Sequence, residues 1–100
     1  MLDRRLTERQ SVDVYFNKYV DGHPYLCRSL NLSHRGLRAL SLSEPENEAE
    51  RFAIELRLPG DDESLWVWAR RAWTIGTEQA IEFVAMAPQA RAQLDRYLAA

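Results

Sequence analysis

Arginine is concentrated at the start of the chain, where the first ten residues read MLDRRLTERQ. Arg5 and Arg9 are four positions apart, with Arg4 beside the first of them. On a helical turn this spacing places both guanidinium groups on one face, and in extended chain it places them on the same side. Arginine pairs bidentately with phosphate and with the O6/N7 edge of guanine. The pattern fits a nucleotide-binding arm or, alternatively, solvated charges that only aid solubility.

A second polar stretch, NLSHRG at residues 31–36, lies between two expected strands. Asn31 and Ser33 can form side-chain turns with the local backbone, and Gly36 permits positive φ. The same stretch also offers an amide, a hydroxyl and a glycine that lets a ligand approach the backbone closely. These are the groups that the edge of a purine requires, so a turn and a binding site are both open interpretations.

Alternation of apolar and polar residues with a period of two predicts six strands. They are expected at residues 11–20, 24–30, 37–42, 51–58, 64–74 and 79–86. Turn residues such as Asp21-Gly22 separate them. Short strands at regular spacing indicate an all-β fold, a six-stranded antiparallel β-barrel. The period then changes to that of a helix, which predicts a short amphipathic C-terminal α-helix.

The expected organisation is therefore a single domain over residues 1–100. It divides into a flexible arginine-rich arm (1–10), a barrel (11–86) and a helix (88–99). The formal net charge of −2 argues against a general nucleic-acid binder. The single cysteine, Cys27, excludes an internal disulfide and favours a cytoplasmic location, where we expect it to be buried and inert. No apolar run is long enough to predict membrane insertion.

Three tryptophans lie in one expected strand, Trp66 and Trp68 on one face and Trp73 on the other. We expect them in the core or at its rim, with Trp73 alternatively flanking a ligand. His34 is expected to be exposed in its loop. The two histidines and one cysteine lie on separate segments, so no metal site is expected. No catalytic site is expected either, because no nucleophile–base pair or pair of catalytic carboxylates is recognisable.

The two polar stretches together resemble the PilZ domain family. The family pattern is RxxxR before the first strand and [D/N]xSxxG after the second, and here it reads RLTER and NLSHRG. The resemblance covers the full chain and includes GLRAL, WARRAW, AIEF and the closing RAQLDRYL. Two positions depart from the family: Asn31 stands where many members have Asp, and Ala80 where Gly is common.

This resemblance implies a receptor for the bacterial second messenger cyclic di-GMP, with no other cofactor. Ligand binding is implied for six motif residues: Arg4, Arg5, Arg9, Asn31, Ser33 and Gly36. Additional ligand contacts are expected less strongly from His34, Arg35, Arg38 and Trp73. Binding would order the N-terminal arm against the barrel and change a surface for a downstream protein partner.

Two other functions remain open. A PilZ-like adaptor could bind a protein partner without nucleotide, although such members typically lack the motif residues that this chain retains. A small barrel that binds single-stranded nucleic acid would need a basic groove lined with aromatic side chains. The net acidity disfavours that reading, so no nucleic-acid polymer is expected as a partner.

Overall fold

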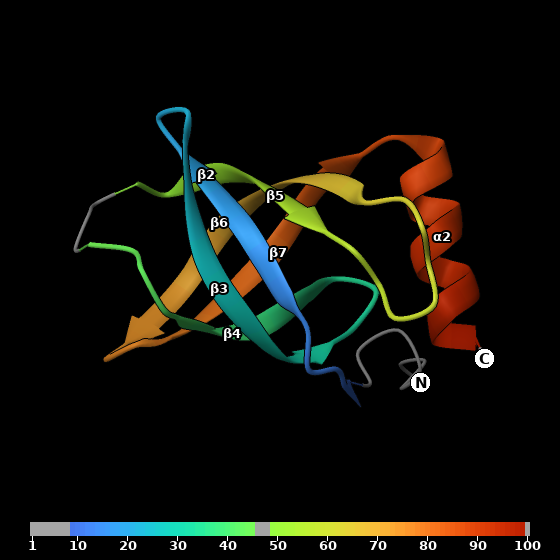
Figure 1. The fold of residues 1–100 in the computed structure, drawn as a ribbon, viewed down its shortest axis with the longest axis horizontal. Helices are drawn as coiled ribbons and strands as arrows, with labels where there is room; N and C mark the ends of the chain where they lie inside the picture. Colours follow the sequence, from blue (N-terminus) through green and yellow to red (C-terminus); the bar gives the residue numbers. More distant parts are fainter. Residues whose placement is uncertain (1–8, 46–48, 100) are drawn as a thin grey trace, which may run out of the picture.

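The structure is a computed structural model that describes residues 9–45 and 49–99. Its elements, in chain order, are β1 (Gln10–Ser11), β2 (Tyr15–Val20), β3 (His23–Leu32), β4 (Gly36–Ser41), β5 (Arg51–Leu56), β6 (Leu65–Ile75), β7 (Glu78–Met86) and α2 (Pro88–Ala99). All strand pairs are antiparallel, in the order β1-β3-β2-β5-β6-β7-β4. An additional pairing of β3 with β4 closes six of these strands into a barrel (Figure 1). The predicted barrel and C-terminal helix are confirmed.

The barrel interior is filled by the inward-facing residues of the alternating strands. Phe16, Phe52 and Ile54 are each at most 3% exposed. Helix α2 packs at one end of the barrel and buries Ala90 and Leu94 on its inner stripe (Figure 1). Within the described part of the chain, no helix has the length and apolar character needed to cross a membrane.

The strand expected at residues 11–20 is interrupted after Ser11 and resumes at Tyr15. The cause is the buried side chain of Ser29 on β3. Its hydroxyl donates to the carbonyl of Val12 and accepts from the backbone N–H of Val14 at 3.1 Å. Because a side chain replaces ladder hydrogen bonds here, one predicted strand becomes β1 and β2.

A β-bulge in β3 determines where Asn31 points. Ser29 pairs with Ala39 on β4, but the next pair joins Asn31 to Arg38, so Leu30 is an additional residue in the strand. Strict alternation would place Asn31 on the inward face together with Ser29. The bulge instead brings it to the outer wall of the barrel, opposite Arg38.

A second bulge in β6 has the same effect on Trp73. The register shifts between Arg71 and Trp73, so Ala72 is the additional residue and Trp73 lies on the outer face with Trp66 and Trp68. The prediction that Trp73 lies on the other face is therefore wrong. So is the prediction of tryptophans in the core or its rim, because their exposed fractions are 51% for Trp66, 45% for Trp68 and 38% for Trp73.

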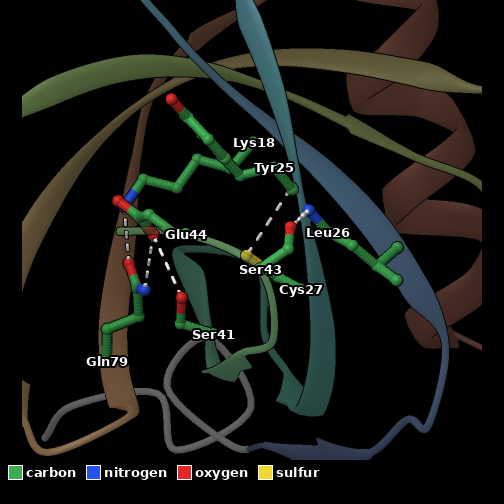
Figure 2. A network of polar contacts seen from close by, with 8 residues as sticks. All are labelled: Lys18, Tyr25, Leu26, Cys27, Ser41, Ser43, Glu44 and Gln79. Carbon is green, nitrogen blue, oxygen red and sulfur yellow. Dashed lines mark hydrogen bonds and ion pairs between the residues drawn. The ribbon is translucent and has the colours of Figure 1, made fainter. Parts of the chain in front are cut away.

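A buried polar network lies toward the end of the barrel away from α2 (Figure 2). Lys18 is 1% exposed, and its Nζ donates to both carboxylate oxygens of Glu44, at 3.0 and 2.8 Å, and to Oε1 of Gln79 at 2.9 Å. The ammonium also lies 4.2 Å from the centroid of the Phe52 ring. Each partner offsets the cost of burying this charge. Cys27, next to this network, is fully buried as predicted.

Candidate functional site

The amide oxygen of Asn31 joins two arginine residues on the outer wall of the barrel. Oδ1 accepts a hydrogen bond from the backbone N–H of Arg38 at 3.2 Å and another from Nη1 of Arg9 at 3.0 Å. The first bond fixes the Asn31 side chain against β4. The second holds the Arg9 guanidinium over the same surface, just before β1.

Arg38 and Trp73 form the centre of this surface. The guanidinium carbon of Arg38 lies 5.4 Å from the centroid of the Trp73 ring, within the range of a cation–π interaction. Nη2 of Arg38 also pairs with the Glu78 carboxylate. Its Nε atom is buried and has no hydrogen-bond partner among the described residues. The Arg38 side chain as a whole is 41% exposed, so a ligand would approach its guanidinium from the solvent-facing side rather than at Nε.

The two guanidinium groups influence each other electrostatically. Partial burial lowers the pKa of Arg9, and the nearby positive charge of Arg38 lowers it further. Arginine nevertheless stays protonated at neutral pH. Two like charges that are held close together favour the arrival of an anion between them.

A cavity of about 300 Å³ lies beside these groups. Its size is at the lower end of the range for small-molecule sites in proteins. Its lining residues come from the segment before β1, the turn before β4, and strands β6 and β7: Arg9, Arg35, Gly36, Ala72, Trp73, Ala80, Ile81 and Glu82. The structure thus brings together Arg9, Arg35, Gly36 and Trp73 of the predicted site, with Asn31 and Arg38 adjacent.

Ser33 and Gly36 have structural roles in the turn between β3 and β4. Ser33 is 2% exposed, and its hydroxyl accepts from the N–H of Arg35 and donates to the carbonyl of Gly36. Gly36 does not have a positive φ, contrary to our expectation. Glycine is needed for another reason: a Cβ atom there would lie 2.1 Å from the carbonyl oxygen of Ile81 on β7.

His34 points toward α2 and does not line the cavity. Its Nε2 lies 3.5 Å from the Asp95 carboxylate, and its carbonyl accepts from Nη1 of Arg91 at 2.9 Å. With a side chain that is 26% exposed, it is half-buried rather than the exposed loop histidine we expected. At the other end of the helix, Gln10 donates to the carbonyl of Leu98 at 2.9 Å. The turn between β3 and β4 and the residue after Arg9 are therefore both hydrogen-bonded to α2.

Two of the predicted ligand residues, Arg4 and Arg5, lie outside the described residues. Glu78 and Glu82, which were not predicted from the sequence, bring carboxylates to this surface. No sequence signal marks them, since acidic residues on an outward strand face are ordinary. In the segments that the structure describes, no group of His, Cys, Asp or Glu is arranged to hold a metal ion.

The structure is a small closed β-barrel whose outer wall carries a cationic and aromatic surface beside a cavity. The family model of the PilZ domain matches residues 3–100, and the chain belongs to the PilZ domain family. PilZ domains are binding and adaptor modules rather than enzymes, and they generally serve as cyclic di-GMP receptors. No curated protein shows significant sequence similarity to the chain.

The solved structures to which the chain is similar include two that align with 91% of it. One is the PilZ domain of CeSA from a cellulose-synthesizing bacterium, with a TM-score of 0.70, 17% identity, and coverage of 91% of this chain and 94% of that one. The other is the Bacillus subtilis inhibitor of motility MotI/DgrA, with a TM-score of 0.76 and 13% identity. That alignment covers 91% of this chain but only 47% of the MotI chain, so the chain spans about half of MotI.

Proposed function

We propose that the protein is a cyclic di-GMP receptor whose ligand binds on the outer wall formed by β3, β4, β6 and β7. The observation that carries the proposal is the convergence of Arg9 and Arg38 on Asn31, beside the exposed ring of Trp73. Cyclic di-GMP has two phosphodiester charges and two guanine rings. Guanidinium groups that both pair with phosphate and stack on rings, together with an indole face, suit that chemistry.

Each residue then has a distinct role. Arg9 and Arg38 bind phosphate or a guanine edge, and Trp73 provides a face on which a guanine stacks. Asn31 orients the Arg9 guanidinium through its amide oxygen, which also accepts from the backbone N–H of Arg38. Arg35 lines the cavity and adds a further positive charge. Ser33 and Gly36 act indirectly, because they set the turn that presents Arg35. Arg4 and Arg5 would approach from the N-terminal arm.

The signal would pass through helix α2. A ligand bound at Arg9 would shift the neighbouring Gln10, whose side chain donates a hydrogen bond to the carbonyl of Leu98 on α2. A ligand in contact with Arg35 would shift the turn that contains His34, whose carbonyl accepts a hydrogen bond from Arg91 on α2. Ordering of the N-terminal arm would therefore change the surface that α2 and the arm present to a downstream protein partner.

A nucleotide-independent adaptor is the second candidate function. Its support is the structural likeness to MotI, which is described as an inhibitor of motility. The structural roles of Ser33 and Gly36 also support it. Since both residues are required by the turn itself, their retention is explained without a ligand.

Titration calorimetry with cyclic di-GMP separates the two functions. Wild-type protein should bind, and Arg9→Ala should weaken binding about tenfold or more, as expected for loss of a charged hydrogen bond. Arg57→Ala is the matched control, because Arg57 is exposed and lies outside the cavity lining. If the wild type gave no heat, the receptor function would be rejected in favour of the adaptor.

A further inference from the structure

An apolar surface covers the outer face of the barrel across β2, β5, β6 and β7. Tyr19, Ala53, Trp68 and Ala85 are successive cross-strand partners in one row. Trp66 lies in the next row, with its ring centroid 5.2 Å from that of Tyr19. We call these five residues the tryptophan face. Adjacent indole rings that are about half exposed are characteristic of protein interfaces and uncommon on surfaces that remain in water.

Two opposite charges flank this face along β5. Arg51 and Glu55 lie two residues before and two residues after Ala53, and the period of the strand turns all three toward the outside. The two charged residues are about 13 Å apart along an extended strand. The face therefore has a positive edge and a negative edge, with the apolar row between them.

Both charged side chains have polar groups without a partner among the described residues. Arg51 lies directly opposite Arg70 on β6, and Arg70 pairs with Glu82 at 3.1 Å. The Arg51 side chain makes no hydrogen bond or ion pair with the described part of the chain, so its guanidinium faces a like charge without a counterion. Glu55 accepts from the hydroxyl of Tyr19 through Oε1 at 3.2 Å. Its Oε2 has no hydrogen-bond partner within residues 9–45 and 49–99.

This arrangement is self-complementary. A twofold rotation about an axis near Ala53 exchanges the positions of Arg51 and Glu55. Two chains that dock face to face about such an axis would bring each Arg51 against the other chain's Glu55. The two copies of Trp68 would then pack together beside Ala53. Contacts of this kind, in which the same patch is used by both subunits, are typical of twofold dimers.

We infer that the tryptophan face binds a second copy of this chain and forms a symmetric dimer. An unrelated partner would have to supply an acid at one edge and a base at the other. A second copy supplies both by symmetry and removes the indole rings from water. This inference does not depend on nucleotide binding, because the face uses none of the residues of the cavity.

Sedimentation velocity tests the inference on the full chain without nucleotide, over about 1 μM to about 1 mM, the range in which weak interfaces titrate. The apparent molecular mass of the wild type should rise with protein concentration from that of one chain toward that of two chains. Trp68→Lys should remain a monomer. Ile75→Lys should behave as the wild type, because Ile75 is a 73% exposed apolar residue of the same strand outside the face.

Charge reversal gives the sharper test. Arg51→Glu or Glu55→Arg alone brings like charges together at two symmetric contacts and should weaken the dimer by roughly tenfold. The double variant R51E/E55R restores both pairs and should recover the dimer. Circular dichroism confirms that each variant is folded. The inference would be overturned by any of three results. The wild type could be monomeric at all concentrations, Trp68→Lys and Ile75→Lys could lose dimerisation equally, or the folded double variant could fail to recover the dimer.

Discussion

Arg38 and Trp73 meet across β7, because both are cross-strand partners of the same residue, Ala80. The two come from strands that are not hydrogen-bonded to each other, yet the guanidinium of Arg38 reaches the indole ring. A small side chain at position 80 makes this contact possible. Ala80 therefore lies beneath this contact and lines the adjacent cavity, and the family's common glycine at this position would also leave room for the contact.

Replacement of Trp73 should weaken nucleotide binding through loss of stacking. Trp73→Ala is expected to reduce the affinity for cyclic di-GMP about tenfold or more, since stacking of a base on an aromatic ring contributes about 1–3 kcal/mol. Trp73→Phe should retain most of the affinity. Calorimetry measures both, with Trp66→Ala as an exposed tryptophan control from the same strand. Equal effects of Trp66→Ala and Trp73→Ala would contradict the assignment.

Substitutions at Asn31 test its role as an acceptor. Asn31→Ala leaves both the Arg9 guanidinium and the Arg38 N–H without this oxygen, and should lower nucleotide affinity about tenfold and stability by about 1 kcal/mol. Asn31→Asp keeps both bonds and adds a charge that attracts Arg9, so its affinity should equal or exceed that of the wild type. A large loss of affinity in Asn31→Asp would instead show that the amide N–H₂ donates to the ligand.

Gly36→Ala should destabilise the fold. The added methyl group would collide with the Ile81 carbonyl on the neighbouring strand, and relief requires β4 and β7 to separate. We expect a loss of about 2 kcal/mol or more in urea denaturation, comparable with overpacking of a core. An unchanged denaturation midpoint together with lost nucleotide binding would assign the glycine to ligand contact instead.

Removal of one member of the buried ion pair should cost more than removal of both. Lys18→Met leaves the Glu44 carboxylate, 6% exposed, without its ammonium partner, and should destabilise by about 3–5 kcal/mol. The double variant K18M/E44Q removes both charges and should recover much of that loss. Urea denaturation measures all three proteins. If the double variant were less stable than Lys18→Met, the charges would not be coupled.

The thiol of Cys27 should be unreactive in the folded protein. Burial raises its pKa to about 12 from an ordinary value of 9.0, so the neutral thiol is favoured in the folded state. The unfolded chain loses this proton first as the pH rises, so stability should fall between about pH 9 and 12. A thiol reagent at pH 8 should label Cys27 only after denaturation. Cys27→Ala should show a weaker decline at alkaline pH, and rapid labelling of the native protein would contradict the burial.

Elements with a regular period could be predicted from the sequence. The alternation in RFAIELRL and the helical spacing in PQARAQLDRYLAA reflect which residues face the core, and that pattern is local. Arg9, Asn31 and Gly36 could be selected as parts of a candidate site because their types and order are specific, and the structure places them close together. Arg35 was predictable as a candidate from its place within the second motif.

The remaining features depend on contacts between distant segments. No residue type marks Leu30 or Ala72 as the additional residue of a bulge, yet these two positions decide which way Asn31 and Trp73 face. Lys18 can be buried because Glu44 and Gln79, which lie far from it in the sequence, accept hydrogen bonds from its ammonium group. The exposed indole rings likewise could not be predicted, because tryptophan side chains are usually largely buried. An alternating pattern shows which residues share a face of a strand, but it does not show which of the two faces lies toward the core.

The two bulges make the outward direction of Asn31 and Trp73 independent of the additional residues themselves. Deletion of Leu30 would restore a regular ladder between β3 and β4, and Asn31 would still face outward because it would directly follow the inward-facing Ser29. The same reasoning applies to Ala72 and Trp73 on β6. A relative that lacks one residue at position 30 or 72 is therefore expected to keep the same outer wall, whereas a relative that keeps the residue without the bulge would turn Asn31 or Trp73 into the interior.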